Sequence, residues 1–413
     1  MWTNLISEFL QDLRKQKLRT SLTIIAICWG TIAVITLLAF GEGLSMRMME
    51  GLRGGGNQVM MFYGGQTSRS YEGLDVGRRI RFSEEDIGIL RRSIPQIELI
   101  SAQYGRSVSL RSDYATTNTY MEGVDASFDE MRSMYPAAGG RFINARDVAE
   151  QRRVVFLGPE VASQLFPEGN AIGSRLIIDN NPYTVVGVMQ EKMQMAMNNG
   201  PDARRAIIPH TTYRQTYNPS RVGSILIRPS DPGHQERVEY RVREIMSRKY
   251  RFHADDKQAI GVWDFIEAER IQSQVALGVK VFLFSVGFFT LLIAGVGVAN
   301  IMYVVVKERT REIGVKKAIG AQNRHIISQF IFEALFICML GGVAGVLISS
   351  GLIFGVQSLN LEGGVADFLG NPVLTTDAMI MTSGVLTMIG LAAGVFPARR
   401  AALVNPVESL RYE

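Results

Sequence analysis

Four long stretches of this chain are nearly free of charged residues, and this feature limits its fold more than any other. They run from Ser21 to Gly41 and from about Val281 to Val306, Ile326 to Val356 and Ala378 to Phe396. A helix of about 20 apolar residues crosses the hydrocarbon core of a membrane. The sequence therefore predicts an α-helical membrane protein with four transmembrane helices. The first is expected to be a retained anchor, because no small-residue cleavage site follows it.

Lysine and arginine gather in the short segments on one side of these stretches. They occur in residues 1–20, 307–325 and 397–413, whereas residues 357–377 contain neither. Short cytoplasmic segments are enriched in both residue types. We therefore expect a multi-pass protein of the cytoplasmic (inner) membrane with both termini and the 307–325 loop inside. Residues 42–280 and the 357–377 loop are expected on the periplasmic side.

Residues 42–280 have the pattern of a large α+β domain, with short alternating strands and amphipathic helices. Asn180 and Asn181 are expected to form the turn of a β-hairpin. The helix predicted at 266–278 leads into the second membrane helix, and helical extensions of the first two membrane helices are expected to form a stalk. The predicted strands cover 59–63, 98–124, 153–157, 174–179, 183–188, 224–228 and 260–265, and the other helices cover 84–94, 159–166 and 235–249.

The sequence provides little for catalysis or for metal binding. Its histidines have no metal-ligand spacing, and Cys28 and Cys338 both lie in apolar stretches. The net charge of +5 is spread along the chain without arginine–aromatic clusters, so a nucleic-acid partner is not expected. A run of methionines, at 189, 193, 195 and 197, could contact apolar cargo or a soft metal, but a mobile loop with some core contacts is the favoured interpretation. We expect no catalytic residue, cofactor or metal in this chain.

The 307–325 loop contains the most informative pattern. Glu312 and Lys316 have the spacing of a helix-stabilising pair, Val315 and Ile319 form an apolar ridge, and Gly320 is placed to end a helix. This pattern predicts a short helix that docks a cytoplasmic partner, with a basic loop on acidic lipid headgroups as the alternative. The candidate docking residues are Glu308, Arg309, Glu312, Ile313, Gly314, Val315, Lys316, Ile319 and Gly320.

Glu333 is a carboxylate about seven residues into the third apolar stretch. Intramembrane carboxylates usually face a polar partner or another helix. We expect Glu333 to face the helix bundle in a paired or neutral state and to help couple the loop to the membrane helices. A shallow glutamate at the membrane surface is the alternative.

Several separated motifs together resemble those of FtsX-like ABC permeases of the MacB type. In the membrane part they are the 307–320 segment followed by Gln329-Phe-Ile-Phe-Glu333-Ala-Leu335, Lys17-Leu-Arg-Thr-Ser-Leu22 with Gly41-Glu-Gly43, and Phe396-Pro-Ala-Arg-Arg-Ala401. In the outer part, Leu157-Gly-Pro-Glu-Val-Ala162 and Tyr183-Thr-Val-Val-Gly-Val188 are similar to the MacB-like periplasmic core. The resemblance extends over nearly the whole chain.

The resemblance implies a dimeric permease, with a homodimer favoured over a heterodimer, whose outer domain has a porter part interrupted by a sabre part. The 307–320 segment would be the coupling helix seated on an ABC ATPase, and the stalks would relay ATP-driven motion outward. The sequence has no G-x-x-x-x-G-K-[ST] phosphate loop, so ATP and Mg²⁺ are expected on a separate ATPase subunit. Gly295 and Gly297 are expected to serve helix packing instead.

Export or efflux of a substrate from the periplasmic side is the leading functional hypothesis. Such a permease would contact membrane lipids. A periplasmic adaptor and an outer-membrane channel are possible further partners. A lipoprotein-releasing permease and a regulatory FtsX-like mechanotransmitter that controls a cell-wall hydrolase are the alternatives. A membrane-anchored ectoenzyme is the least favoured.

Overall fold

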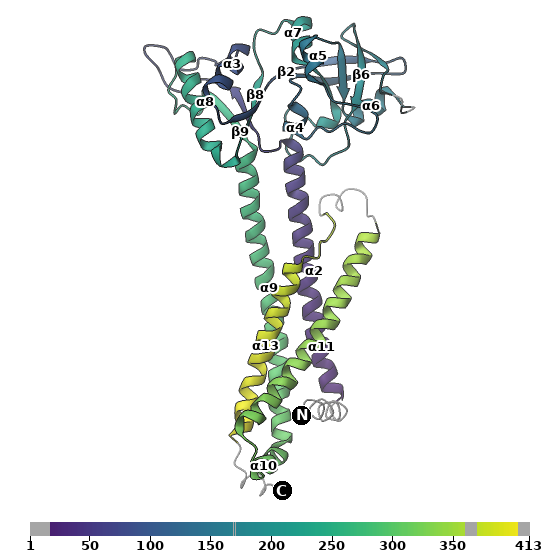
Figure 1. Cartoon of the computed structure of the whole chain (residues 1–413), viewed down its shortest axis with the longest axis vertical. Helices are drawn as coiled ribbons and strands as arrows, with labels where there is room; N and C mark the ends of the chain where they lie inside the picture. The colour runs from purple at the N-terminus through teal and green to yellow at the C-terminus, as the bar shows by residue number, and fades with distance from the viewer. Residues whose placement is uncertain (1–16, 168, 170, 360–369, 404–413) are drawn as a thin grey trace. The chain divides into compact units, whose positions relative to one another are not determined.

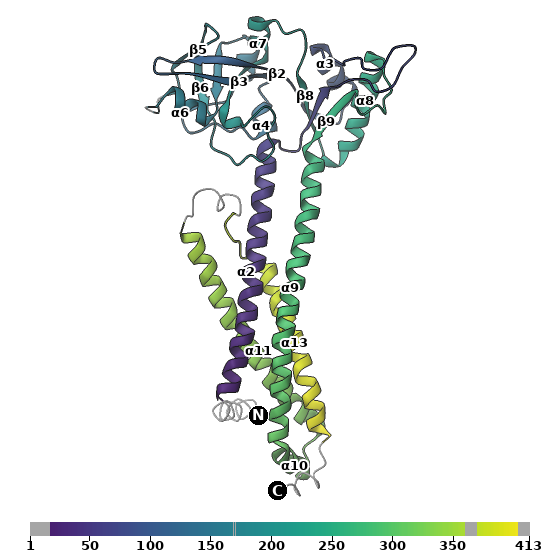
Figure 2. The same ribbon diagram turned by 180° about the vertical axis from the view of Figure 1, so that it is seen from behind.

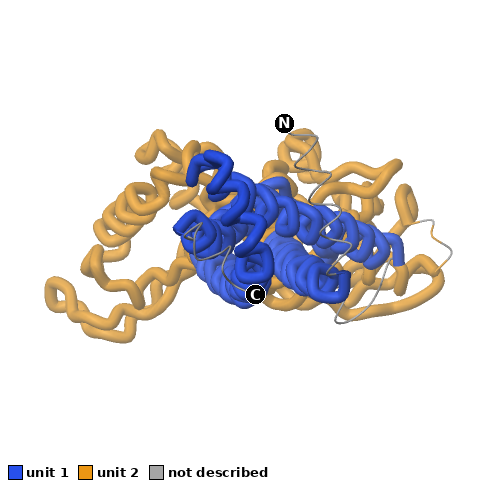
Figure 3. Tube along the Cα trace, turned by 90° about the horizontal axis from the view of Figure 1, so that it is seen from below, with its two compact units in different colours: residues 1–47, 274–413 blue, residues 48–273 orange. Residues whose placement is uncertain are grey.

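A computed structural model describes residues 17–167, 169, 171–359 and 370–403 of the chain. It has two compact units, Met48–Ser273 and the combination of Met1–Arg47 with Gln274–Glu413 (Figure 3). The predicted N-terminal segment before residue 17, residues 360–369 of the 357–377 loop and the tail after residue 403 lie outside the described residues.

Four described helices are long and apolar enough to cross a membrane, and each contains one of the predicted stretches. They are α2 (Lys17–Gly55), α9 (Phe265–Glu308), α11 (Asn323–Ser358) and α13 (Thr376–Ala402) (Figure 1). α2 continues beyond the predicted end at Gly41, and α9 begins before the predicted start at Val281. The helical extensions expected for the first two membrane helices are therefore present.

Small residues allow the membrane helices to pack closely. A Cβ added to Gly345 of α11 would collide with the side chain of Thr31 of α2, and one added to Gly295 of α9 would collide with Ile389 of α13. Glycine at such positions lets neighbouring helices approach each other. The packing role expected for Gly295 agrees with this contact, whereas Gly297 faces open space among the described residues.

The outer unit is built around a mixed sheet in which one long strand takes part in two substructures. The strands are β1 (Met60–Gly64), β2 (Ile97–Arg111), β3 (Thr116–Val124), β4 (Val154–Leu157), β5 (Arg175–Ile178), β6 (Asn181–Val188), β7 (Arg205–Pro209), β8 (Ser224–Pro229) and β9 (Ile260–Asp264). The first part of β2 pairs with β8 in a four-stranded sheet of order β2-β8-β1-β9. Its second part pairs with β3 and β5, which closes β2-β3-β7-β4-β6-β5 into a six-stranded barrel.

The barrel is inserted into the chain between strands of the four-stranded sheet. β1 and the start of β2 precede the barrel strands, and β8 and β9 follow them. The chain order thus agrees with the expected arrangement of one part interrupted by another.

Two helices, α3 (Glu84–Ser93) and α8 (Gln235–Tyr250), cover one face of the four-stranded sheet (Figures 1 and 2). Leu90 and Val242 on these helices share a buried core with Phe62 of β1. Ser83 caps α3 in a capping box with Asp86. The remaining short helices are α4 (Phe128–Arg132), α5 (Ala145–Ala149), α6 (Pro159–Leu165), α7 (His210–Tyr217) and the 3-10 turns η1 (Asp202–Arg204) and η2 (Pro232–His234).

The predicted hairpin is present, but its turn lies one residue earlier than expected. Asp179 and Asn180 have φ angles of 44° and 68°, while Asn181 already begins β6. A two-residue turn with both central residues at positive φ matches the twist of a hairpin, and Asp and Asn tolerate that conformation. The sequence analysis did not predict α4, α5, α7 or β7.

Candidate functional site

The predicted docking helix corresponds to α10 (Thr310–Ala318), between α9 and α11. The Thr310 hydroxyl donates to the carbonyl oxygens of Val306 and Lys307 at 3.1 and 2.8 Å, so it bonds to the last turn of α9. Gly320 follows the helix with φ of 100°, a conformation that glycine adopts easily. The expected stop at Gly320 is therefore present.

α10 has one face buried in its own helix bundle and another face exposed. Ile313 is 4% exposed and Gly314 is also buried, so these two candidate docking residues instead pack inward and support the helix. Val315 and Ile319 are 41% and 81% exposed. The apolar ridge is thus the part of α10 that remains open for a partner.

Glu333 lies inside the bundle and has a basic partner. Its carboxylate Oε1 is 3.0 Å from Nη1 of Arg309, and Gln329 Nε2 donates to the same oxygen at 3.3 Å. The Arg309 and Glu333 side chains are only 14% and 6% exposed. Arg309, which was expected on the docking surface, therefore points inward and links the start of α10 to α11. Its guanidinium compensates the charge of the buried Glu333 carboxylate.

Polar contacts also join the coupling region to α2 and α13. Glu308, at the end of α9, pairs with Arg19 of α2 at 3.7 Å, and Lys317 Nζ donates to the carbonyl oxygen of Ala402 at 2.7 Å. Within α10, Glu312 and Lys316 form the expected pair at 3.0 Å. Both side chains of the Glu308–Arg19 pair are about half exposed, so the pair adds little to stability. It shows that the end of α9 lies beside α2.

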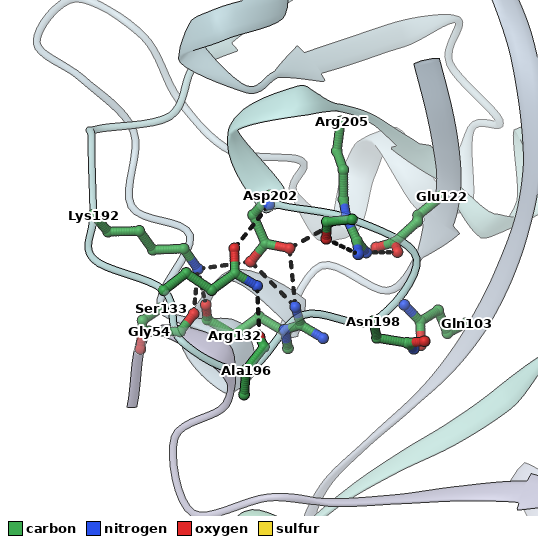
Figure 4. Close-up of polar contacts among 12 residues, drawn as sticks. Gly54, Gln103, Glu122, Arg132, Ser133, Lys192, Ala196, Asn198, Asp202 and Arg205 are labelled. Atoms are coloured by element: carbon green, nitrogen blue, oxygen red, sulfur yellow. Dashed lines mark hydrogen bonds and ion pairs between the residues drawn. The ribbon is translucent and has the colours of Figure 1, made fainter. Parts of the chain in front are cut away.

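A second polar cluster, which the sequence analysis missed, lies in the outer unit (Figure 4). The carboxylate of Asp202 accepts hydrogen bonds from Arg132 Nη2 at 2.9 and 3.2 Å and lies 2.9 Å from Lys192 Nζ. Arg205 Nε is 3.3 Å from the same carboxylate, and its guanidinium also pairs with Glu122. All of these side chains except Lys192 are at most 1% exposed. We call these five residues the buried ionic cluster.

The buried ionic cluster holds the end of α2. Lys192 Nζ donates to the carbonyl oxygens of Gly54, in the last turn of α2, and Arg132, at 2.7 and 2.5 Å. The last carbonyls of a helix lack partners within the helix, and a cation is favoured there. Burial lowers the pKa of the Lys192 ammonium, and the carboxylate of Asp202 opposes that shift.

The methionine segment, residues 189–197, lies against the same helix end. The Met195 backbone nitrogen donates to the Gly51 carbonyl oxygen at 2.9 Å, and the Met195 side chain contacts Gly51. Met189 is buried, whereas Met195 and Met197 are 39% and 50% exposed. Movement of this end of α2 within the outer unit would therefore break contacts with both the segment and the cluster.

The described residues contain no group of three or more histidine, cysteine or acidic side chains that could hold a metal ion. The cluster residues missed by the sequence analysis come from distant parts of the chain, since Arg132 and Asp202 are 70 positions apart. The only local sign of this cluster in the sequence is that charged residues stand within or next to apolar strand patterns, as at Glu122 and Arg205.

The sequence matches two protein families over adjacent regions. Residues 20–245 match the MacB-like periplasmic core domain, and residues 284–406 match the FtsX-like permease C-terminal domain. Together these regions include most of the outer unit and most of the membrane helices.

Curated relatives are similar over nearly the whole chain. The macrolide export ATP-binding/permease protein MacB of Bdellovibrio bacteriovorus is 28% identical over 98% of this chain and 61% of its own length. The pyoverdine export ATP-binding/permease protein PvdT of Pseudomonas fluorescens is 30% identical over 96% of this chain and 57% of its own length. The chain thus spans about 60% of the length of these relatives.

A solved structure of the periplasmic region of MacB from Actinobacillus actinomycetemcomitans is also similar. It has 18% sequence identity and a TM-score of 0.43, with 54% of this chain and 96% of that chain covered.

Proposed function

The chain belongs to the family of FtsX-like ABC permeases with a MacB-like periplasmic core domain, and from this premise we propose that it works with a separate ATPase subunit. That subunit would bind ATP and Mg²⁺ and dock on α10. The observation that carries the proposal is the exposed Val315–Ile319 ridge on a short helix whose opposite face is packed into the membrane bundle.

The contacts of α10 support a role in transmitting motion rather than in chemistry. A push on α10 would reach α11 through Arg309–Glu333, α13 through Lys317, and α2 through the Glu308 end of α9. α2 is a continuous helix from Lys17 to Gly55, so a shift of α2 along its axis would also move Gly54 and strain its hydrogen bond with Lys192. The chain would thus act as a mechanotransmitter.

We place both termini and α10 in the cytoplasm and the outer unit in the periplasm, on the basis of the lysine and arginine distribution. The names of the relatives favour export of a substrate. We propose that this export starts on the periplasmic side and uses an adaptor and an outer-membrane channel as further partners. A homodimer would cover exposed apolar side chains of α9 such as Phe289 and Ile293, which are 61% and 72% exposed, and lipid would cover the rest.

Docking can be tested by reversing one charge on α10. Glu312→Lys removes the pair with Lys316 and places two cations one helical turn apart, which should loosen a docked ATPase mainly by raising its dissociation rate. We expect the variant to lose the ABC ATPase that co-purifies with the wild-type chain from native membranes, as measured by mass spectrometry and ATP hydrolysis.

Lys316→Gln is the matched control, because it removes the same pair without adding positive charge. It should retain the ATPase, and Ile319→Ser should lose it because the exposed ridge is weakened. A basic loop that only binds acidic headgroups would tolerate Glu312→Lys. Normal co-purification with both Glu312→Lys and Ile319→Ser would therefore contradict docking through α10.

A further inference from the structure

The outer unit contains a cleft of about 600 Å³ where the four-stranded sheet, the barrel and the end of the methionine segment meet. Its walls come from β1, β2, β8 and β9, from β3 and α7, from the loop 219–223 between α7 and β8, and from residues 198 and 199. Sites for small molecules typically have volumes of about 300–1,000 Å³. The cleft is therefore large enough for a ring-bearing molecule of moderate size.

Aromatic side chains form much of this cleft. Tyr104 and Tyr213 stack with their ring centres 5.4 Å apart, Trp263 comes from the edge strand β9, and Tyr63 comes from its neighbour β1. Burial, followed by the charge of Glu84, raises the pKa of Tyr104 to about 12, so its hydroxyl stays protonated at neutral pH. Aromatic walls provide flat apolar contact together with hydroxyl groups that can donate hydrogen bonds.

Gln103 supplies an unused polar group to the cleft. The residue is 5% exposed, and its Oε1 accepts a hydrogen bond from the Ser224 hydroxyl at 2.6 Å. Its Nε2 donates to no other described residue. This donor faces the cleft, where a ligand oxygen or a water molecule can accept its hydrogen bond. Figure 4 shows the Gln103 side chain beside Asn198, another residue of the cleft.

The charge of the cleft limits what it can accept. None of the described residues that line it is acidic, and the only charged one is Arg221, which is exposed. Amide, hydroxyl and guanidinium donors favour oxygen acceptors, and a positively charged ligand would find no counter-charge.

We propose that this cleft is a binding site for a neutral or anionic molecule with a flat ring and an oxygen-rich edge, of the chemical class of aryl glycosides. The ring lies against the tyrosine and tryptophan walls, and one ligand oxygen accepts the hydrogen bond of Gln103 Nε2. The site does not depend on ATPase docking, because every residue that forms it belongs to the outer unit.

Trp263 provides a direct readout of occupancy. The chain has three tryptophans, Trp2, Trp29 and Trp263, and only Trp263 lines the cleft. In the full chain carrying Trp2→Phe and Trp29→Phe, reconstituted in lipid nanodiscs without ATP or ATPase, we would titrate phenyl β-D-glucopyranoside. We expect a saturable change in Trp263 emission, and phenethylamine, a cationic ring compound, should give none.

Two variants locate the binding. Gln103→Leu should weaken the apparent affinity roughly tenfold through loss of one hydrogen bond to the ligand. Ser220→Phe, at an exposed position on the cleft, should block binding without altering the core, and Ser230→Phe beyond the other end of β8 should leave it unchanged. No saturable response to the glucoside, equal binding of phenethylamine, or full binding by Ser220→Phe would overturn the proposal. Transport or ATPase results would not bear on it.

Discussion

Gly54 shows how strongly a single position can depend on its neighbours. A Cβ added to this residue would clash sterically with the carbonyl oxygen of Met193. Because this oxygen belongs to the backbone, it cannot move aside as a flexible side chain could. We expect Gly54→Ala to destabilise the outer unit by about 1–3 kcal/mol, as overpacking usually does. The measurement is thermal unfolding of the full chain in nanodiscs.

Gly278 of α9 is the matched control, because a Cβ added there meets nothing within 4 Å among the described residues. Alanine is also the better helix former, so Gly278→Ala should leave the unfolding temperature unchanged or raise it. Equal effects of the two substitutions would show that the contact between Met193 and the end of α2 does not restrain this helix.

Glu333 also shows what a sequence can indicate about one residue. A carboxylate in an apolar stretch must be compensated, so a bundle-facing, paired Glu333 could be expected from the sequence. Its partner could not, because Arg309 lies 24 positions away in a basic loop where several cations were available. The pattern of the 307–325 loop placed Arg309 on the docking surface, whereas in the structure its side chain pairs with Glu333 inside the bundle.

Local patterns identified many elements, but not the pairings between them. Ser83 and Asp86 mark the start of α3, and the positive-φ turn at Asp179 and Asn180 follows from residues within a few positions. The double role of β2 depends on strands more than 100 positions apart, such as its pairing with β8. Register and strand order are set by such distant contacts, so no local pattern predicted the closed barrel.

The buried ionic cluster should control the stability of several elements together. Asp202 forms ion pairs with Arg132 of α4, with Arg205 of β7 and with Lys192, which holds α2. Replacing it with asparagine removes the negative charge and leaves these buried cations undercompensated. We expect Asp202→Asn to lower the free energy of unfolding of the outer unit by about 3–5 kcal/mol.

The control is Asp255→Asn, which breaks an exposed ion pair with Arg69. The Arg69 and Asp255 side chains are 59% and 69% exposed. Water already solvates both groups, so the denaturant midpoint should hardly change. Chemical denaturation monitored by Trp263 fluorescence, in the chain with Trp2→Phe and Trp29→Phe, measures both variants. A small effect of Asp202→Asn would mean that the cluster adds little to the stability of the outer unit.

The proposed orientation of the whole molecule rests on charge in segments that are far apart in the sequence. The 307–325 loop and residues 1–20 contain clustered lysine and arginine, and residues 357–377 have none. All of these segments are short enough for the positive-inside rule to apply, and they agree with one another. The large outer unit contributes little to this argument, because long domains are translocated largely irrespective of their charge.

This orientation predicts that Ser70, in the outer unit, and Gln322, just before α11, lie on opposite sides of the membrane. Both positions are exposed, so a cysteine at either should react with a maleimide that reaches it. After removal of the native Cys28 and Cys338, a membrane-impermeant maleimide added to spheroplasts should label Ser70→Cys and leave Gln322→Cys unmodified. Permeabilised cells should show both labelled, which controls for reactivity. If Gln322→Cys is labelled in intact spheroplasts and Ser70→Cys is protected, α10 faces outward, and docking of a cytoplasmic ATPase on it is impossible.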